Sequence, residues 1–200
     1  MKKLAILVSG RGSNFEAIAR NIREGRLEAE IVAVVSNSPT AKALETAESL
    51  GLRAISLPSK GIETDTYAAM VVEALAPLQV DLICLAGFMR RVGAPLLEAY
   101  AQRILNIHPS LLPSFPGLHV QQQALDYGVK FSGCTVHFVD AGLDTGPIVM
   151  QAAVPVEDGD TADTLAARIL VEEHKIFSQA IALVLSGAYR VDGRRIIRKD

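Results

Sequence analysis

An amide and an imidazole stand two residues apart in Asn106-Ile107-His108, just before a proline-rich loop. If this stretch ends a strand, Asn106 and His108 share a face at the sheet edge where open α/β proteins bind ligands. Asp144 follows later, in a turn with Gly142 and Gly146 on its two sides, which would let its carboxylate approach the imidazole. These three groups can stabilise an oxyanion and orient the histidine, so they predict acyl transfer without a covalent nucleophile.

Residues 9–14 read Ser-Gly-Arg-Gly-Ser-Asn and join an apolar run to an amphipathic segment. Such a turn directs backbone N–H groups at an anion, with help from the helix dipole. A dinucleotide site is not expected, because Phe15 replaces the third glycine of that fingerprint and Ser36-Asn37 stand where an acidic ribose ligand belongs. The loop therefore predicts a site for one phosphate, with a plain strand-to-helix turn as the alternative.

Two other chemistries fit the sequence poorly. His108, His119, His137 and Asp144 are metal-binding types, but their spacing matches no metal motif, and His137 lies in the middle of an expected strand. A serine hydrolase would need a G-x-S-x-G elbow, which is absent, and Ser110 follows the histidine too closely to be its nucleophile. We therefore expect no metal and no acyl-enzyme.

Apolar and flat side chains follow the most apolar run, at residues 85–89, and a cation comes next at Arg90. A segment of this kind can form the wall of a site for a planar ligand whose ring edge is read by backbone groups. The alternative is a strand end that packs against a helix.

Alternating apolar runs and amphipathic segments predict a parallel sheet with right-handed crossovers. We expect strands at residues 4–8, 31–35, 53–57, 80–86, up to 107, 132–139 and 148–156. We expect helices at residues 13–24, 40–50, 64–76, 94–100, 119–127 and 161–185. The first helix carries the S-x-x-E form of a capping box at Ser13 to Glu16. The fold class is α/β, a doubly wound, mostly parallel sheet with an antiparallel C-terminal addition.

The composition is that of an ordinary globular protein, with half of the 200 residues apolar and a formal net charge of −2. We therefore expect no nucleic acid and no membrane among its partners. Cys84 and Cys134 lie in separate apolar runs, which is typical of buried thiols in a reducing compartment. The apolar start at residues 4–8 is too short for a signal peptide, so we expect a cytoplasmic protein.

The motifs S-G-x-G-S-N, L-A-G-F-M-R, N-I-H-P-S-L-L-P-x-x-P-G and T-V-H-F-V-D-x-G-x-D-x-G-P-I-V-x-Q together resemble the folate-dependent formyltransferases. The similarity runs from about residue 4 to residue 186. The first motif, and the P-G-L-H that ends the third, resemble the branch of that family that acts on a glycinamide ribonucleotide. The resemblance implies a Rossmann-like formyltransferase fold and transfer of the formyl group of 10-formyltetrahydrofolate to the amine of phosphoribosylglycinamide, in purine biosynthesis.

The resemblance also assigns roles. Asn106 and protonated His108 would stabilise the formyl oxyanion, and Asp144 would favour that protonated form and orient its ring. The acceptor would contact a second group of residues: Gly12, Ser13, Asn14 and Glu173. The folate would contact a third group, with Asn106 shared: Met89, Arg90, Arg91 and Val92. Members of the family often have an arginine for the acidic folate tail where this chain has Thr64, so Arg90 or Arg91 would compensate.

The resemblance further implies one formyltransferase domain over residues 1–200, with a phosphate-binding half at about 1–100. A catalytic and folate-binding half covers about 85–186, and a terminal hairpin covers 187–200. A homodimer is one alternative for the oligomeric state. Other readings are a formyltetrahydrofolate deformylase, expected to carry an N-terminal regulatory domain, and a tRNA-directed formyltransferase, expected to carry a C-terminal barrel. A phosphate-binding module without catalysis is the last alternative.

Overall fold

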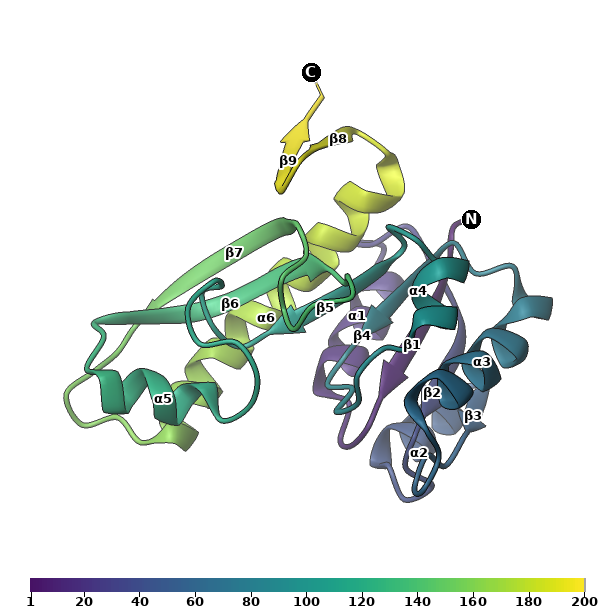
Figure 1. The fold of residues 1–200 in the computed structure, drawn as a ribbon, viewed down its shortest axis with the longest axis horizontal. Helices are drawn as coiled ribbons and strands as arrows, with labels where there is room; N and C mark the ends of the chain where they lie inside the picture. The colour runs from purple at the N-terminus through teal and green to yellow at the C-terminus, as the bar shows by residue number, and fades with distance from the viewer. Residues whose placement is uncertain (200) are drawn as a thin grey trace. The chain divides into compact units, whose positions relative to one another are not determined.

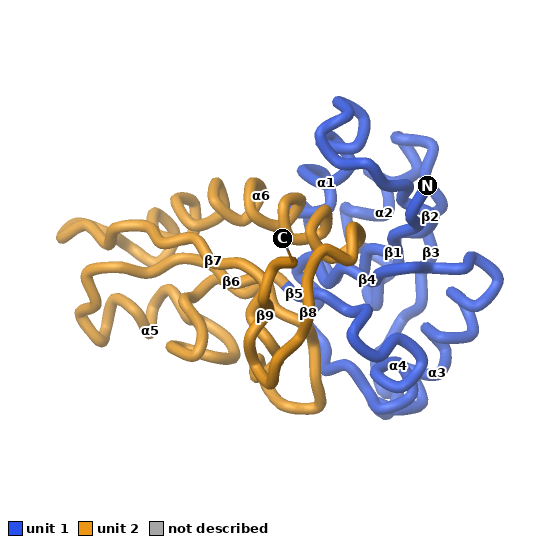
Figure 2. Tube along the Cα trace, turned by 90° about the horizontal axis from the view of Figure 1, so that it is seen from above, with its two compact units in different colours: residues 1–106 blue, residues 107–200 orange. Residues whose placement is uncertain are grey.

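The computed structural model describes residues 1–199, and the chain forms two compact units that meet in sequence between Asn106 and Ile107 (Figure 2). The last residue of the expected terminal hairpin, Asp200, lies outside the described residues. No helix within the described residues is long and apolar enough to span a membrane.

Unit 1 is a parallel sheet with helical crossovers (Figure 1). Its strands are β1 (Lys3–Val8), β2 (Glu30–Ser36), β3 (Ala54–Ser56), β4 (Leu82–Leu85) and the start of β5 (Ile104–His108). Its helices are α1 (Ser13–Arg23), α2 (Lys42–Ser49), α3 (Thr64–Leu75), the 3-10 turn η1 (Ala76–Leu78) and α4 (Ala94–Ala99). The strands pair in the order β3-β2-β1-β4-β5, all parallel. This confirms the predicted doubly wound sheet and brings the carboxyl ends of these strands to one edge.

Unit 2 adds an antiparallel pair covered by a long helix. Its elements are the end of β5, α5 (Val120–Tyr127), β6 (Phe131–Phe138), β7 (Ile148–Pro155), α6 (Ala162–Ser186), β8 (Tyr189–Asp192) and β9 (Arg195–Arg198). β6 and β7 pair antiparallel, and α6 packs along both of them (Figure 1). β8 and β9 form the expected hairpin. The predicted antiparallel C-terminal addition is therefore confirmed.

Burial follows from the apolar runs. Residues 4–8 of β1 have no exposed surface, as expected for a strand covered on both faces. Cys84 and Cys134 are buried and form no disulfide, as predicted. Every expected helix and strand is present, with ends within two residues of the prediction.

The predicted capping box at Ser13 is wrong. Ser13 is the first helical residue of α1, and the cap position belongs to Gly12, whose φ of 81° lies in the left-handed region. A Cβ at Gly12 would lie 2.6 Å from the Cβ of Ala43, so glycine is required both for the turn and for the close approach of α2. No side chain within the described residues caps this helix, which leaves its first turn suited to an external anion.

Candidate active site

Asn106 and His108 both lie in β5, two residues apart, so their side chains project from the same face of the strand. Asn106 is half-buried, and it is paired with Leu85 of β4. His108 is the last residue of the strand and is only 5% exposed. The predicted strand end is therefore confirmed, and the imidazole leaves it in an environment with little water.

In unit 2, the carboxylate of Asp144 lies between two imidazoles. Its Oδ2 is 3.6 Å from Nδ1 of His108, and its Oδ1 is 3.7 Å from Nε2 of His137. The backbone N–H of Gly117 donates a hydrogen bond to Oδ2 at 2.9 Å, which fixes the carboxylate. The structure thus brings Asp144 to His108, as the sequence predicted.

The turn that carries Asp144 is shaped by close backbone approaches. Asp144 itself has a φ of 53°, in the left-handed region that few non-glycine residues adopt. A Cβ at Gly146 would lie 1.8 Å from the carbonyl oxygen of Phe138, at the end of β6. The turn can therefore reach the histidines only because residue 146 has no side chain.

His137 is a member of the site that its sequence context did not predict. The sequence predicted His137 in the middle of a strand, whereas it is the penultimate residue of β6. The register of β6 against β7 and the return of the 140–147 turn bring it beside Asp144. Burial lowers the pKa of His137, and the Phe138 carbonyl and the Asp144 carboxylate oppose that effect. The net effect favours the neutral form of the His137 ring beside the carboxylate.

The second nitrogen of His108 is also in contact. Nε2 lies 2.9 Å from the backbone carbonyl oxygen of Phe115, so this nitrogen carries a proton and donates it. The hydroxyl of Ser110 lies 2.6 Å from the carbonyl oxygen of Ser114 and 3.0 Å from that of Phe115. The loop after β5 therefore folds back over the histidine that leads into it.

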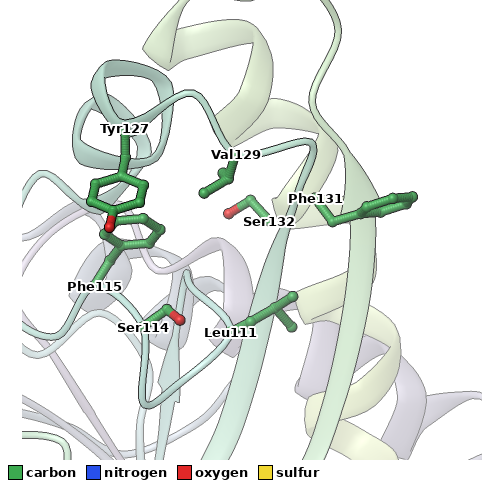
Figure 3. A pocket seen from close by; sticks show the side chains of 7 residues that line it. All are labelled: Leu111, Ser114, Phe115, Tyr127, Val129, Phe131 and Ser132. Atoms are coloured by element: carbon green, nitrogen blue, oxygen red, sulfur yellow. The ribbon is translucent and has the colours of Figure 1, made fainter.

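Two further sets of contacts hold the loop that follows β5. The buried hydroxyl of Thr135 donates to the Ser110 carbonyl at 2.7 Å and accepts from the Leu112 N–H at 3.0 Å. Farther along, the ring of Phe115 packs edge-on against Tyr127, with centroids 5.9 Å apart (Figure 3). Both rings line a cavity of about 280 Å³. Its other lining residues are Leu111, Ser114, Val129, Phe131 and Ser132.

In unit 1, the predicted phosphate loop and the 88–92 segment lie beside each other. The Met89 N–H donates to the hydroxyl of Ser9 at 2.7 Å, and the Ser9 N–H donates to the Gly87 carbonyl at 3.1 Å. Gly12, Ser13 and Asn14 follow at the start of α1, and the side chain of Asn14 is buried. Met89 itself is 69% exposed, which leaves an apolar side chain open to a flat ligand.

Arg90 is already engaged. Its Nη1 donates to the Ser59 carbonyl at 3.1 Å and its Nη2 to the Ile62 carbonyl, while the guanidinium carbon lies 4.8 Å from the ring centroid of Tyr67. Burial raises the pKa of the Tyr67 hydroxyl to about 12. The sequence predicted that Arg90 or Arg91 replaces the missing tail-binding arginine, but these contacts fix Arg90 to its own unit. Arg91 is exposed.

Glu173 lies in the middle of α6 and is only 7% exposed. Burial raises the pKa of Cys134 to about 12, with the negative charge of Glu173 as a further cause. Glu173 therefore lies close to Cys134 in the β6 strand. Within residues 1–199, no group of three or more His, Cys, Asp or Glu side chains is arranged to hold a metal ion.

Known proteins are similar to this chain over nearly its whole length. The family model described as formyl transferase matches residues 2–181. Phosphoribosylglycinamide formyltransferase of Bacillus subtilis is 43% identical over 186 residues, which cover 92% of this chain and 95% of that protein. The trifunctional purine biosynthetic protein adenosine-3 of Drosophila pseudoobscura is 46% identical over 192 residues, which cover 94% of this chain and 14% of that protein.

Glycinamide ribonucleotide transformylase 1 from Symbiobacterium toebii has a similar structure, with a TM-score of 0.97 and 48% identity. The superposition covers 100% of this chain and 95% of that one. The chain spans about 14% of the length of the trifunctional insect relative but 95% of the length of the Bacillus subtilis protein. The family match and these identities agree with the motifs around Asn106, His108 and Asp144, and the chain belongs to the formyl transferase family.

Proposed function

We propose that this chain transfers the formyl group of 10-formyltetrahydrofolate to the amine of phosphoribosylglycinamide, a step of purine biosynthesis. The observation that carries the proposal is a buried imidazole, His108, that faces the carboxylate of Asp144 at 3.6 Å and shares a strand face with Asn106. The names of the bacterial relatives support the choice of acceptor.

In the proposed reaction, the folate supplies a formyl carbon bound to a ring-linked nitrogen. The acceptor amine forms a bond to that carbon and loses one proton, the old carbon–nitrogen bond breaks, and the released nitrogen gains one proton. The amide of Asn106 and the N–H of His108 stabilise the oxyanion that develops between these events. Asp144 orients the imidazole and balances the charge on it.

His108 has to exchange one contact before it can play this role. Its Nε2 donates to the Phe115 carbonyl, and its Nδ1 faces Asp144, so neither nitrogen is directed at open space. We infer that the formyl oxygen replaces the Phe115 carbonyl at Nε2 and that Asp144 stays in place. The loop at residues 113–118 must therefore shift when the substrates bind.

The acceptor phosphate belongs at Gly12, Ser13 and Asn14, where α1 begins without a side-chain cap. We also assign the buried carboxylate of Glu173 to the acceptor. The folate ring belongs along residues 89–92, against the exposed side chain of Met89.

The acidic tail of the folate requires a different cation from the one that the family often uses. Thr64 is the first residue of α3, and the Glu63 carboxylate caps that helix by accepting from the N–H groups of Asp65 and Thr66. A second carboxylate would be repelled there. Since Arg90 is held by backbone carbonyls, we assign the tail to the exposed Arg91.

Four finer points complete the proposal. The reaction uses no metal, because the imidazole and amide donors supply the oxyanion stabilisation. The protein acts in the cytoplasm on small molecules, without nucleic acid or membrane. It forms one domain, and a homodimer is its proposed assembly. Metal analysis of the purified active protein tests whether the reaction uses a metal. The mass of the protein in solution tests whether it is a homodimer.

The purified protein, incubated with 10-formyltetrahydrofolate, tests the activity through release of tetrahydrofolate. We expect release only when phosphoribosylglycinamide is also present, and a loss of release in His108→Ala. Release without the acceptor would instead identify a deformylase. Binding of the nucleotide with no release under either condition would leave a phosphate-binding module.

A further inference from the structure

A closed ring of hydrogen bonds joins the two ligand-binding segments of unit 1. The Met89 N–H donates to Ser9 Oγ at 2.7 Å, and the Ser9 hydroxyl donates to Oδ1 of Asn37 at 2.6 Å. The Nδ2 of Asn37 donates to Ser59 Oγ at 3.2 Å, and Arg90 Nη1 donates to the Ser59 carbonyl at 3.1 Å. Because Met89 and Arg90 are neighbours in the chain, the ring is complete.

The members of this ring come from four separate loops. Ser9 directly follows β1, Asn37 directly follows β2, Ser59 follows β3, and Met89 and Arg90 follow β4. Ser59 is buried, and Ser9, Asn37 and Arg90 are half-buried. Hydrogen bonds in such partly dry surroundings are stronger than in water and reinforce each other along a chain.

Ser9 is the junction between the two segments. It lies three residues before Gly12, the first residue that we assign to the acceptor phosphate, and its hydroxyl accepts from the segment that we assign to the folate. Asn37 holds that hydroxyl, since its carboxamide oxygen accepts the only proton that Ser9 Oγ can donate. If either segment shifts, the hydrogen bond between Met89 and Ser9 changes, and that hydrogen bond helps to order the other segment.

We propose that Ser9 and Asn37 are positioning residues that couple acceptor binding to folate binding. A ligand that orders one segment reduces the ordering that remains for the other ligand, so each should bind more tightly in the presence of the other. This inference rests on the proposed function for the identity of the ligands. The Ser9–Asn37 pair contacts neither ligand in this account, and it acts only through the two segments.

The coupling is measured by titrating tetrahydrofolate into the protein with and without saturating phosphoribosylglycinamide. In the wild type, we expect the nucleotide to tighten folate binding by about fivefold or more. In Ser9→Ala and in Asn37→Ala this factor should fall to about one, and each ligand alone should bind within about threefold of the wild type. Asn37→Asp keeps the acceptor for Ser9 but loses the donor to Ser59, so it should restore part of the factor.

Ser38→Ala is the matched control. It removes a serine hydroxyl from the same loop after β2, and within residues 1–199 that hydroxyl forms a hydrogen bond only with the hydroxyl of Thr40. The control should keep the full coupling factor. A factor of one in the wild type, or an unchanged factor in both Ser9→Ala and Asn37→Ala, would overturn the proposal. Equal loss in Ser38→Ala would also overturn it.

A measurement on the wild type avoids variants that fail to fold. Phosphoribosylglycinamide alone should slow hydrogen exchange of the Met89 amide, because that N–H donates to Ser9, three residues before Gly12 of the proposed phosphate site. Unchanged exchange at saturating nucleotide would refute the coupling. These outcomes are separate from the activity assay, since a protein that releases tetrahydrofolate normally but shows no coupling refutes only this inference.

Discussion

The Gly146→Ala substitution should reduce catalysis without touching any catalytic side chain. The new Cβ would lie 1.8 Å from the Phe138 carbonyl oxygen, and contacts of this kind below 3.0 Å essentially never occur. The 140–147 turn must therefore move by at least about 1.2 Å, the difference between these two distances. We expect that movement to displace Asp144, two residues away, from its present position 3.6 Å from Nδ1 of His108.

A misplacement of about 1 Å in a catalytic group can cost about a hundredfold in rate, so we expect kcat to fall by about that factor. The assay is the acceptor-dependent release of tetrahydrofolate at saturating substrates. KM for both substrates should change much less than kcat, because the substituted turn contributes no residue that we assign to their binding.

Gly159→Ala is the matched control, because a Cβ there would meet no atom within 4 Å and its φ is outside the left-handed region. It should keep wild-type kcat and melting temperature. If Gly146→Ala retains kcat within about threefold of the wild type, the argument that residue 146 positions Asp144 is wrong. If Gly146→Ala unfolds far below the assay temperature, Asp144→Asn is measured in its place. That substitution removes the charge of the residue 144 side chain and keeps its shape.

Three other changes have defined outcomes. His108→Ala or Asn106→Ala should lower kcat by about a hundredfold or more, and turnover near the wild-type value would refute the oxyanion roles. Because the folded pKa of His137 is depressed, its stabilising contribution is present above the usual value of 6.5 and is lost as the pH falls toward the folded pKa. Denaturant titrations at pH 7.5 and 5.5 should therefore show a smaller fall for His137→Gln than for the wild type, and parallel falls would contradict this. Tyr127→Ala removes a ring contact worth about 1 kcal/mol, so hydrogen exchange near Phe115 should accelerate, and unchanged exchange would exclude this anchor.

The local sequence determines most of the elements, and tertiary contacts determine the exceptions. Apolar runs such as residues 4–8 become buried strands because a parallel sheet covers both faces. The start of α1 at Ser13 is confirmed, but its cap is not, because the contact with Ala43, far away in the sequence, makes glycine necessary at position 12. A capping motif contains no information about that neighbour, so Ser13 was given a role that the backbone of Gly12 takes.

The same distinction applies to the candidate site. The pairing of Asn106 and His108 could be predicted because it depends only on the period of a strand. The place of His137 beside Asp144 depends on strand register and on a turn that returns across it. The engagement of Arg90 depends on carbonyl groups near residue 60, which no pattern around residue 90 reveals.

The hydrogen bond between His108 and the Phe115 carbonyl also affects how much more tightly the proposed site binds the transition state than the substrate. A buried N–H without an acceptor costs about 1–3 kcal/mol, and the Phe115 carbonyl avoids that cost when no substrate is bound. A neutral formyl oxygen gains little by replacing one carbonyl with another. The oxyanion gains more, because hydrogen bonds to a charged acceptor are about twice as strong as those between neutral groups. Displacement of Phe115 therefore favours the transition state over the bound substrate, and this difference in binding is what accelerates a reaction.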